Sequence, residues 1–109
     1  MDYEISVEAA AALLKAGGEN APKLIDVREL WEFGIALVAG SVLIPMGEFA
    51  GRAHQELDPE DHLLIMCHHG ARSLSVTNWL RHQGFDLAQS VSGGIDAWAV
   101  KVDGGVGRY

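Results

Sequence analysis

The chain of 109 residues is poor in cysteine, in basic residues and in long apolar runs. Its single cysteine cannot form a disulfide within the chain, which excludes a disulfide-stapled scaffold. Lysine and arginine number 8 against 15 acidic residues and are scattered, so neither nucleic acid nor an anionic membrane surface is expected as a partner. No apolar stretch approaches the roughly 20 residues that span a bilayer. The acidic start MDYEISVEAA lacks the regions of a signal peptide, so the reducing cytoplasm is the expected compartment.

The composition is that of one small globular domain. Hydrophobic residues make up 49% of the chain, enough to bury a core without disulfides or a metal. We expect the domain to occupy residues 1–102, followed by a glycine-rich tail at 103–109 that should be mobile. No cofactor is expected.

Short apolar runs alternate with helical segments along the chain. Ser6 is a typical N-cap, and Gly17 ends the apolar helical pattern that follows it. Strands are predicted at residues 3–5, 23–27, 41–45, 63–66 and 85–91, and helices at 7–16, 29–34, 46–57, 72–83 and 95–100. The apolar face of the helix after residue 72 is expected at Leu74, Val76, Thr77 and Leu80. This alternation predicts an α/β fold, an open five-stranded parallel sheet with helices on both faces.

Polar or reactive side chains stand where two of these strands end. Asp26 and Arg28 close one apolar strand, and Cys67 follows another. Ligands of open parallel sheets bind beyond the carboxyl ends of the strands. We therefore expect the functional site at this edge, with Cys67 at its centre.

The stretch CHHGARS after the most apolar strand predicts an anion-binding loop. Its members after the cysteine are His68, His69, Gly70, Ala71, Arg72 and Ser73. A tight turn at the glycine followed by a helix start directs unpaired backbone N–H groups at one point. An ordinary cysteine is mostly protonated at neutral pH. Two or three N–H donors, each worth about 1.5–3 kcal/mol to a charged acceptor, would favour the thiolate without a neighbouring base.

The other residues of the loop admit more than one interpretation. Arg72 either supplies a fixed positive charge or pairs with a carboxylate. A metal site at His68 and His69 is disfavoured, because adjacent side chains on a tight loop point in different directions. Both are expected to be exposed and to line the site. For Cys67 the alternative is a buried core cysteine, which the polar loop directly after it disfavours.

Four segments together resemble the rhodanese family of sulfurtransferases. They are LIDVRE at 24–29, GSVLIPMGEF at 40–49, CHHGARS at 67–73 and LRHQGFDLAQSVSGGIDAWA at 80–99. The resemblance covers nearly the whole chain in the right order. It implies that Cys67 takes a sulfur from a small donor such as thiosulfate or a persulfide, and holds it as a persulfide on the loop N–H groups. The sulfur then passes to cyanide, a thiol or a sulfur-carrier protein, and a persulfide-bearing protein is a further candidate partner.

The resemblance also implies supporting roles around the loop. Arg72 would stabilise an anionic donor and fix the loop. Asp26 and Arg28 would brace the neighbouring strand end, and Gly93 and Gly94 would let the backbone approach the site.

Two positions depart from the family pattern. His68 stands where many thiosulfate-using members have arginine, so a permanent charge is lost and thiosulfate is expected to be a weaker donor. Leu37 stands in place of a histidine that often precedes the third strand, and this change concerns local packing more than activity.

Three other functions compete with sulfur transfer. Phosphatases and arsenate reductases share the architecture but have one more residue between cysteine and arginine, because a tetrahedral oxyanion needs a wider loop. A docking or regulatory module without catalysis would keep the fold but typically loses the cysteine. A redox sensor would need a partner thiol, since Cys67 has no second cysteine to resolve it.

Overall fold

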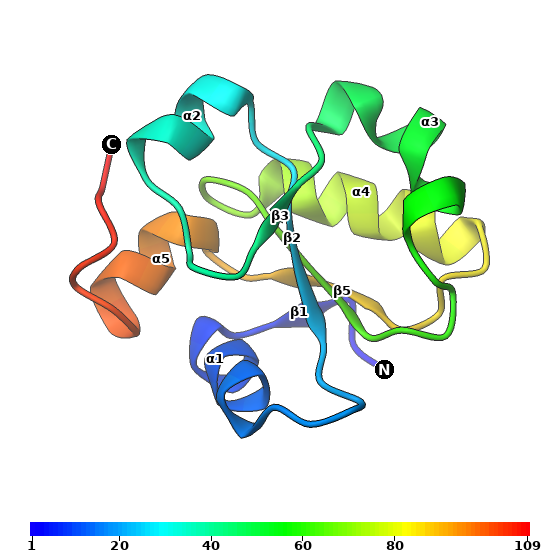
Figure 1. Cartoon of the computed structure of the whole chain (residues 1–109), viewed down its shortest axis with the longest axis horizontal. Helices are drawn as coiled ribbons and strands as arrows, with labels where there is room; N and C mark the ends of the chain where they lie inside the picture. Colours follow the sequence, from blue (N-terminus) through cyan, green and yellow to red (C-terminus); the bar gives the residue numbers. More distant parts are fainter.

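Five parallel strands form the centre of the structure, a computed structural model that describes residues 1–109 (Figure 1). In the sheet they lie in the order β1-β5-β4-β2-β3, and every pairing is parallel. The strands are β1 (Glu4–Ile5), β2 (Lys23–Asp26), β3 (Val42–Leu43), β4 (Leu63–Met66) and β5 (Ala88–Val91). The predicted open five-stranded parallel sheet is confirmed.

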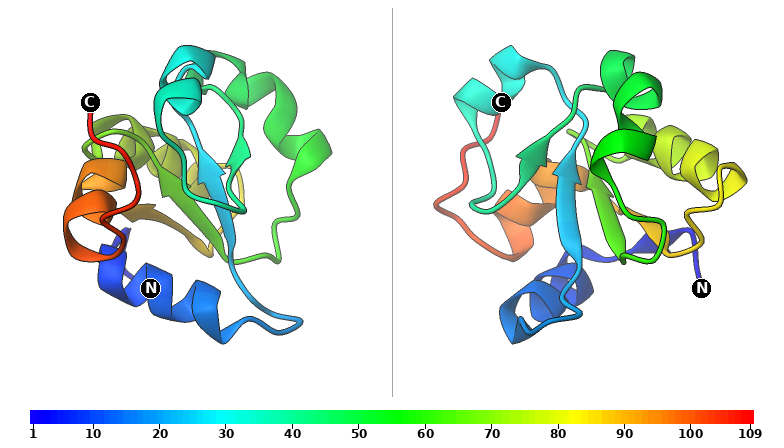
Figure 2. Two further views of the ribbon diagram at one scale, coloured as in Figure 1. Left: turned by 60° about the vertical axis from the view of Figure 1, so that its left-hand side comes forward. Right: turned by 45° about the vertical axis from the view of Figure 1, so that its right-hand side comes forward.

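Helices cover both faces of this sheet (Figures 1 and 2). They are α1 (Val7–Ala16), α2 (Leu30–Ile35), α3 (Met46–Glu56), α4 (Ala71–His82) and α5 (Gly94–Lys101). One apolar cluster joins the sheet to α3 and α4, and a second joins it to α1 and α5. None of the five has the length and hydropathy of a helix that crosses a membrane.

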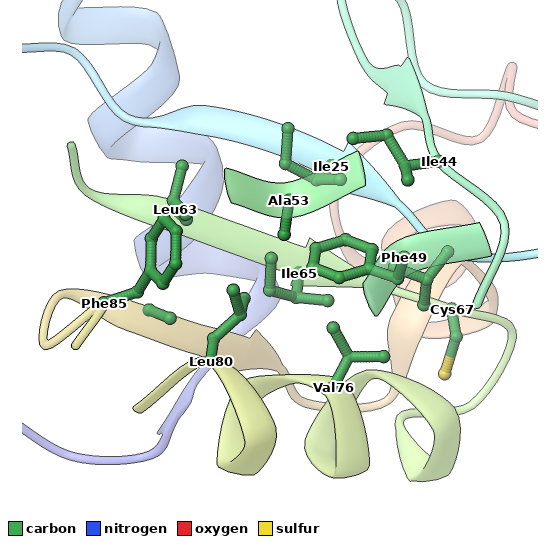
Figure 3. Packing of buried hydrophobic residues seen from close by; sticks show 12 residues of the cluster. Ile25, Ile44, Phe49, Ala53, Leu63, Ile65, Cys67, Val76, Leu80 and Phe85 are labelled. Carbon is green, nitrogen blue, oxygen red and sulfur yellow. The ribbon is translucent and has the colours of Figure 1, made fainter. Parts of the chain in front are cut away.

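The central strand β4 separates the two clusters by simple alternation. Leu63 and Ile65 belong to the cluster under α3 and α4, whereas Leu64 and Met66 belong to the other. All four are fully buried, as a strand covered on both faces requires. Cys67 continues the first series, and Figure 3 shows its side chain in line with Ile65, beyond the Phe49 ring. The alternation of the strand therefore turns the thiol toward α4.

Local sequence signals set several element boundaries. The Ala9 N–H donates to the Ser6 hydroxyl at 3.1 Å, so α1 begins where its N-cap predicts. Gly17, with φ of 62°, ends the helix in the left-handed region. The outer strands are shorter than predicted, with two residues in β3.

The buried face of α4 differs from the predicted one at a single position. Val76, Thr77 and Leu80 are buried as predicted, but Leu74 is exposed and Ser73 is buried in its place. Ser73 is accommodated against the sheet because its hydroxyl lies 2.8 Å from that of Ser90 on β5. The polar contact therefore accounts for a buried serine where hydrophobicity alone would place a leucine.

The tail was predicted to be mobile, and here the structure differs. A turn closes with a hydrogen bond from the Val106 N–H to the Asp103 carbonyl at 3.1 Å. Val106 and Tyr109 then pack against the cluster under α1 and α5. Figure 1 shows the end of the chain returning to α2, at the same end of the sheet as the loop after β4. The domain boundary at residue 102 stays a prediction.

Candidate active site

The Cys67 sulfur is held by the backbone of the loop that follows it. The N–H groups of Gly70 and Ser73 donate to Cys67 Sγ at 3.1 and 3.3 Å. The thiol in turn donates to the Ser73 hydroxyl at 3.4 Å. Cys67 is 1% exposed, so these groups replace the water that would otherwise solvate a charge on the sulfur.

The start of α4 explains why the N–H groups converge there. Gly70 is the N-cap of α4 with φ of 110°, a conformation that glycine adopts freely, and it offers no side chain to cap the helix. The Ser73 N–H, third in the helix, is the donor that an N-cap side chain normally satisfies. Here the Cys67 sulfur accepts it. A helix of 12 residues therefore points the positive end of its dipole at the thiol.

Arg72 pairs with Glu32 of α2 across the mouth of the loop. Its Nη1 and Nη2 donate to Glu32 Oε1 and Oε2 at 2.7 and 2.9 Å, a bidentate geometry. The hydrogen bond from Arg72 is the largest of several causes that hold the pKa of the Glu32 carboxyl at about 2, against burial of that carboxyl. The alternative interpretation of Arg72, a pair with a carboxylate, is what the structure contains. Its charge ties the loop to α2.

Asp26 and Arg28 form a second ion pair, fully buried, at the end of β2. Arg28 Nη2 and Nε donate to the Asp26 carboxylate at 2.6 to 3.0 Å. Its remaining donors reach the carbonyls of Ala36 at 2.6 Å and Glu32 at 3.2 Å, and the Tyr109 hydroxyl at 3.0 Å. All five N–H bonds of the guanidinium are therefore satisfied. The pair braces the C-terminal end of α2 and makes no contact with the thiol.

The two histidines occupy different environments, although both were expected to be exposed. His69 is exposed, and its Nδ1 lies 4.0 Å from the Asp96 carboxylate. His68 is half-buried between the rings of His69 and Tyr109, with centroids 3.9 and 4.0 Å away. Its Nε2 is buried without a hydrogen-bond partner. Burial first, and then the neighbouring His69, lowers the pKa of His68, which favours the neutral ring. No three His, Cys, Asp or Glu side chains are arranged to hold a metal.

The backbone at Gly93 and Gly94 packs directly beneath the loop. Both have positive φ, 77° and 59°. A Cβ on Gly94 would overlap the carbonyl oxygens of Cys67 and His68. The first turn of α5 donates to those same carbonyls, from Ile95 at 2.9 Å and Asp96 at 3.1 Å. Two helices thus meet at residue 67, α5 through the carbonyl and α4 through the sulfur.

Three residues at the site lie outside the set predicted from the sequence. Ser90 carried a weak signal, as a small polar residue inside a predicted strand. Glu32 carried a weaker one, three residues after Glu29, with which it forms a reciprocal capping box. Tyr109 carried none, because its contacts lie 77 and 81 residues away along the chain.

Comparisons with known proteins point to one family. The family model of the rhodanese-like domain matches residues 6–101. A thiosulfate sulfurtransferase, GlpE of Actinobacillus pleuropneumoniae, is 43% identical over 95 residues, covering 87% of this chain and 84% of that protein. The rhodanese-like/PpiC domain-containing protein 12 of Arabidopsis thaliana is 39% identical over 90 residues, covering 80% of this chain. The crystal structure of a rhodanese-like domain protein from Staphylococcus aureus has a TM-score of 0.82 at 25% identity, covering 99% of both chains.

Relatives differ in how much of their length this chain matches. It spans 30% of the Arabidopsis protein and 52% of a Bacillus subtilis relative. The activities of those longer proteins are therefore not attributed to this chain.

The depressed pKa of Glu32 predicts a specific acid sensitivity. A carboxylate whose pKa is about 2 when folded, against an ordinary 4.5, stabilises the fold above pH 4.5 and loses that contribution as the pH falls toward 2. Between pH 6 and pH 3 the wild type should lose about 2 kcal/mol more unfolding free energy than Glu32→Gln. Urea denaturation at both pH values measures this. Glu48→Gln, at an exposed ion pair, is the control, and an equal gap between wild type and Glu32→Gln at both pH values would contradict the prediction.

Proposed function

The chain belongs to the rhodanese-like domain family, and on that premise we propose that it is a sulfurtransferase that carries a sulfane sulfur on Cys67. The strongest support comes from two hydrogen bonds at the start of a helix. The backbone N–H groups of Gly70 and Ser73 both donate to the Cys67 sulfur. Such a site stabilises an anion on sulfur.

The proposed reaction has two nucleophilic steps. The Cys67 thiolate attacks the outer sulfur of the donor, and the donor S–S bond breaks with its electron pair leaving on sulfite or on a thiolate. Cys67 then holds a persulfide anion. An acceptor such as cyanide or a thiolate attacks the terminal sulfur, the Cys67 S–S bond breaks, and the thiolate is regenerated. The negative charge moves from Cys67 Sγ to the terminal sulfur in the first step and returns to Sγ in the second, and the N–H groups at the start of α4 serve both steps by donating to whichever sulfur is charged.

Charge at the site favours persulfide donors over thiosulfate. Arg72 is neutralised by Glu32, and Arg28 by Asp26. His68, in the position after the nucleophile, is kept neutral by burial. A doubly charged donor therefore meets no unpaired guanidinium at the loop. Small-molecule persulfides and proteins bearing a persulfide or an acceptor thiol are the proposed partners, in a reducing compartment that keeps Cys67 free.

The competing functions fit the site less well. A phosphatase needs an arginine free to grip a tetrahedral oxyanion, but Arg72 uses both Nη groups on Glu32, and four residues separate it from Cys67. A docking module would not need a helix N-terminus directed at a thiol.

Intact mass spectrometry tests the proposal directly. After incubation with a small persulfide donor, the wild type should gain one sulfur atom, which cyanide then removes as thiocyanate. The Cys67→Ala variant should gain nothing, because it has no other thiol. If the wild type alkylates readily at neutral pH but gains no sulfur from a persulfide or thiosulfate, the chain is not a sulfurtransferase.

Restoring a charge at residue 68 should shift donor use. His68→Arg places a permanent positive charge beside the nucleophile, and one such charge is worth about 1 kcal/mol or more to an anion nearby. We expect kcat/KM with thiosulfate to rise about threefold to tenfold, with a smaller change for a persulfide. His82→Arg, at the far end of α4, is the control for net charge. An equal gain with both donors, or in both variants, would argue against charge as the determinant.

A further inference from the structure

The tail after α5 returns to the loop that carries Cys67. An exposed ion pair between Arg108 and Asp96 holds it beside α5, with Nε to Oδ1 at 2.9 Å. Gly107 then passes the end of α2, where an added Cβ would lie 3.5 Å from the Ala36 methyl group. Figure 2 shows the tail running along α5 and ending beside α2. This path places Tyr109 beside the Glu32–Arg72 ion pair.

The Tyr109 hydroxyl joins the two ion pairs of the site. It accepts a hydrogen bond from Arg28 Nη1 at 3.0 Å and donates one to Glu32 Oε2 at 2.5 Å. That same Glu32 oxygen accepts the Arg72 Nη2 hydrogen bond. The phenol therefore fixes the carboxylate that anchors the loop arginine, and burial of the hydroxyl raises the pKa of Tyr109, which keeps its proton available to donate.

The Tyr109 ring makes a second, separate contact. It lies nearly parallel to the His68 ring, at 6° and 4.0 Å between centroids, while the Trp31 ring meets it edge-on at 6.3 Å. His68 is the residue directly after the nucleophile. Its orientation is thus set from the tail, through stacking, as well as from its own backbone.

We propose that Tyr109 is a positioning residue for the Cys67 loop, acting on Arg72 through Glu32 and on His68 through ring stacking. This rests on the proposed function, because the geometry being held is that of the N–H groups on the sulfur. Positioning of this kind matters because small displacements of a reacting group reduce rates steeply. None of the hydrogen bonds to or from the Cys67 sulfur involves Tyr109.

The two contacts can be separated by substitution. Tyr109→Phe keeps the ring over His68 and removes only the hydrogen bonds to Arg28 and Glu32. Tyr109→Leu removes both contacts and also uncovers the imidazole. In the wild type, the charged and titratable groups that face His68 are His69 of the loop, Asp96 of α5, Glu32 of α2 and Tyr109. Uncovering the ring should let its pKa rise toward the ordinary value.

The experiment compares wild type, Tyr109→Phe and Tyr109→Leu, with Val102→Ala as a control in the segment just after α5. Iodoacetamide alkylation at neutral pH reports Cys67 alone, since the chain has no other thiol. NMR titration of the His68 ring and urea denaturation are measured on the same samples. We expect Tyr109→Leu to alkylate about threefold or more slowly and to show a raised His68 pKa. Tyr109→Phe should recover the His68 titration but only part of the alkylation rate.

Three results would overturn the proposal. Unchanged alkylation in both variants would show that the loop does not depend on Tyr109. Faster alkylation would show that the tail only covers the thiol. A rate that falls only in step with unfolding free energy, with no change in the His68 titration, would show a merely structural role. Should Tyr109→Leu fail to fold, Tyr109→Phe still decides. Its alkylation should be slower than that of wild type by more than its loss of unfolding free energy accounts for, and an unchanged rate would overturn the proposal.

The same samples separate this proposal from the proposed function. Alkylation and the His68 titration do not depend on sulfur transfer. If wild type gains no sulfur from a persulfide while the Tyr109 variants still alter thiol reactivity, the positioning role stands and the sulfurtransferase proposal fails. If wild type gains sulfur and the Tyr109 variants match it in every measurement, the sulfurtransferase proposal stands and the positioning role fails.

Discussion

The site depends on one constraint, which is that the N-terminus of α4 has no side-chain cap and uses the Cys67 sulfur instead. Gly70 leaves the first turn without a capping oxygen, and Sγ accepts the N–H groups of Gly70 and Ser73. A weak acceptor in this position becomes a much better one when it is negatively charged, because hydrogen bonds to charged groups are stronger. The backbone therefore directs its N–H groups at the position that an anion on sulfur would occupy.

Charged side chains around the loop hold that geometry, and each of them is paired with an opposite charge. Asp26, Arg28, Glu32 and Arg72 alternate in sign, and the Tyr109 hydroxyl connects the middle two. The network is neutral as a whole, so it fixes α2 and the loop without offering a cation to a ligand. Under the proposed function, an anionic donor would bind to the loop N–H groups, and its charge would be matched or not by residue 68.

Local signals in the sequence were sufficient for the elements and for the position of the thiol. The Ser6 cap, the apolar run of β4 and the glycine in the loop each act over a few residues, and the structure contains the features they predict. One position on the buried face of α4 was misassigned because Leu74 is more apolar than Ser73, whose burial depends on Ser90 in a strand distant in sequence. Stacking of His68 under Tyr109 could not be predicted for the same reason, since a glycine-rich segment carries no periodic pattern that reveals where it packs.

The most direct test of the central claim is the response of two amide protons. In ¹⁵N-labelled protein, conversion of the Cys67 thiol to its persulfide should move the Gly70 and Ser73 N–H resonances to lower field, because the negative charge of the terminal sulfur is then held beside these N–H groups. Amides of the exposed glycines in α3 should not move. If mass spectrometry shows the added sulfur and these two resonances stay in place, the loop N–H groups do not hold the charge and the account is wrong.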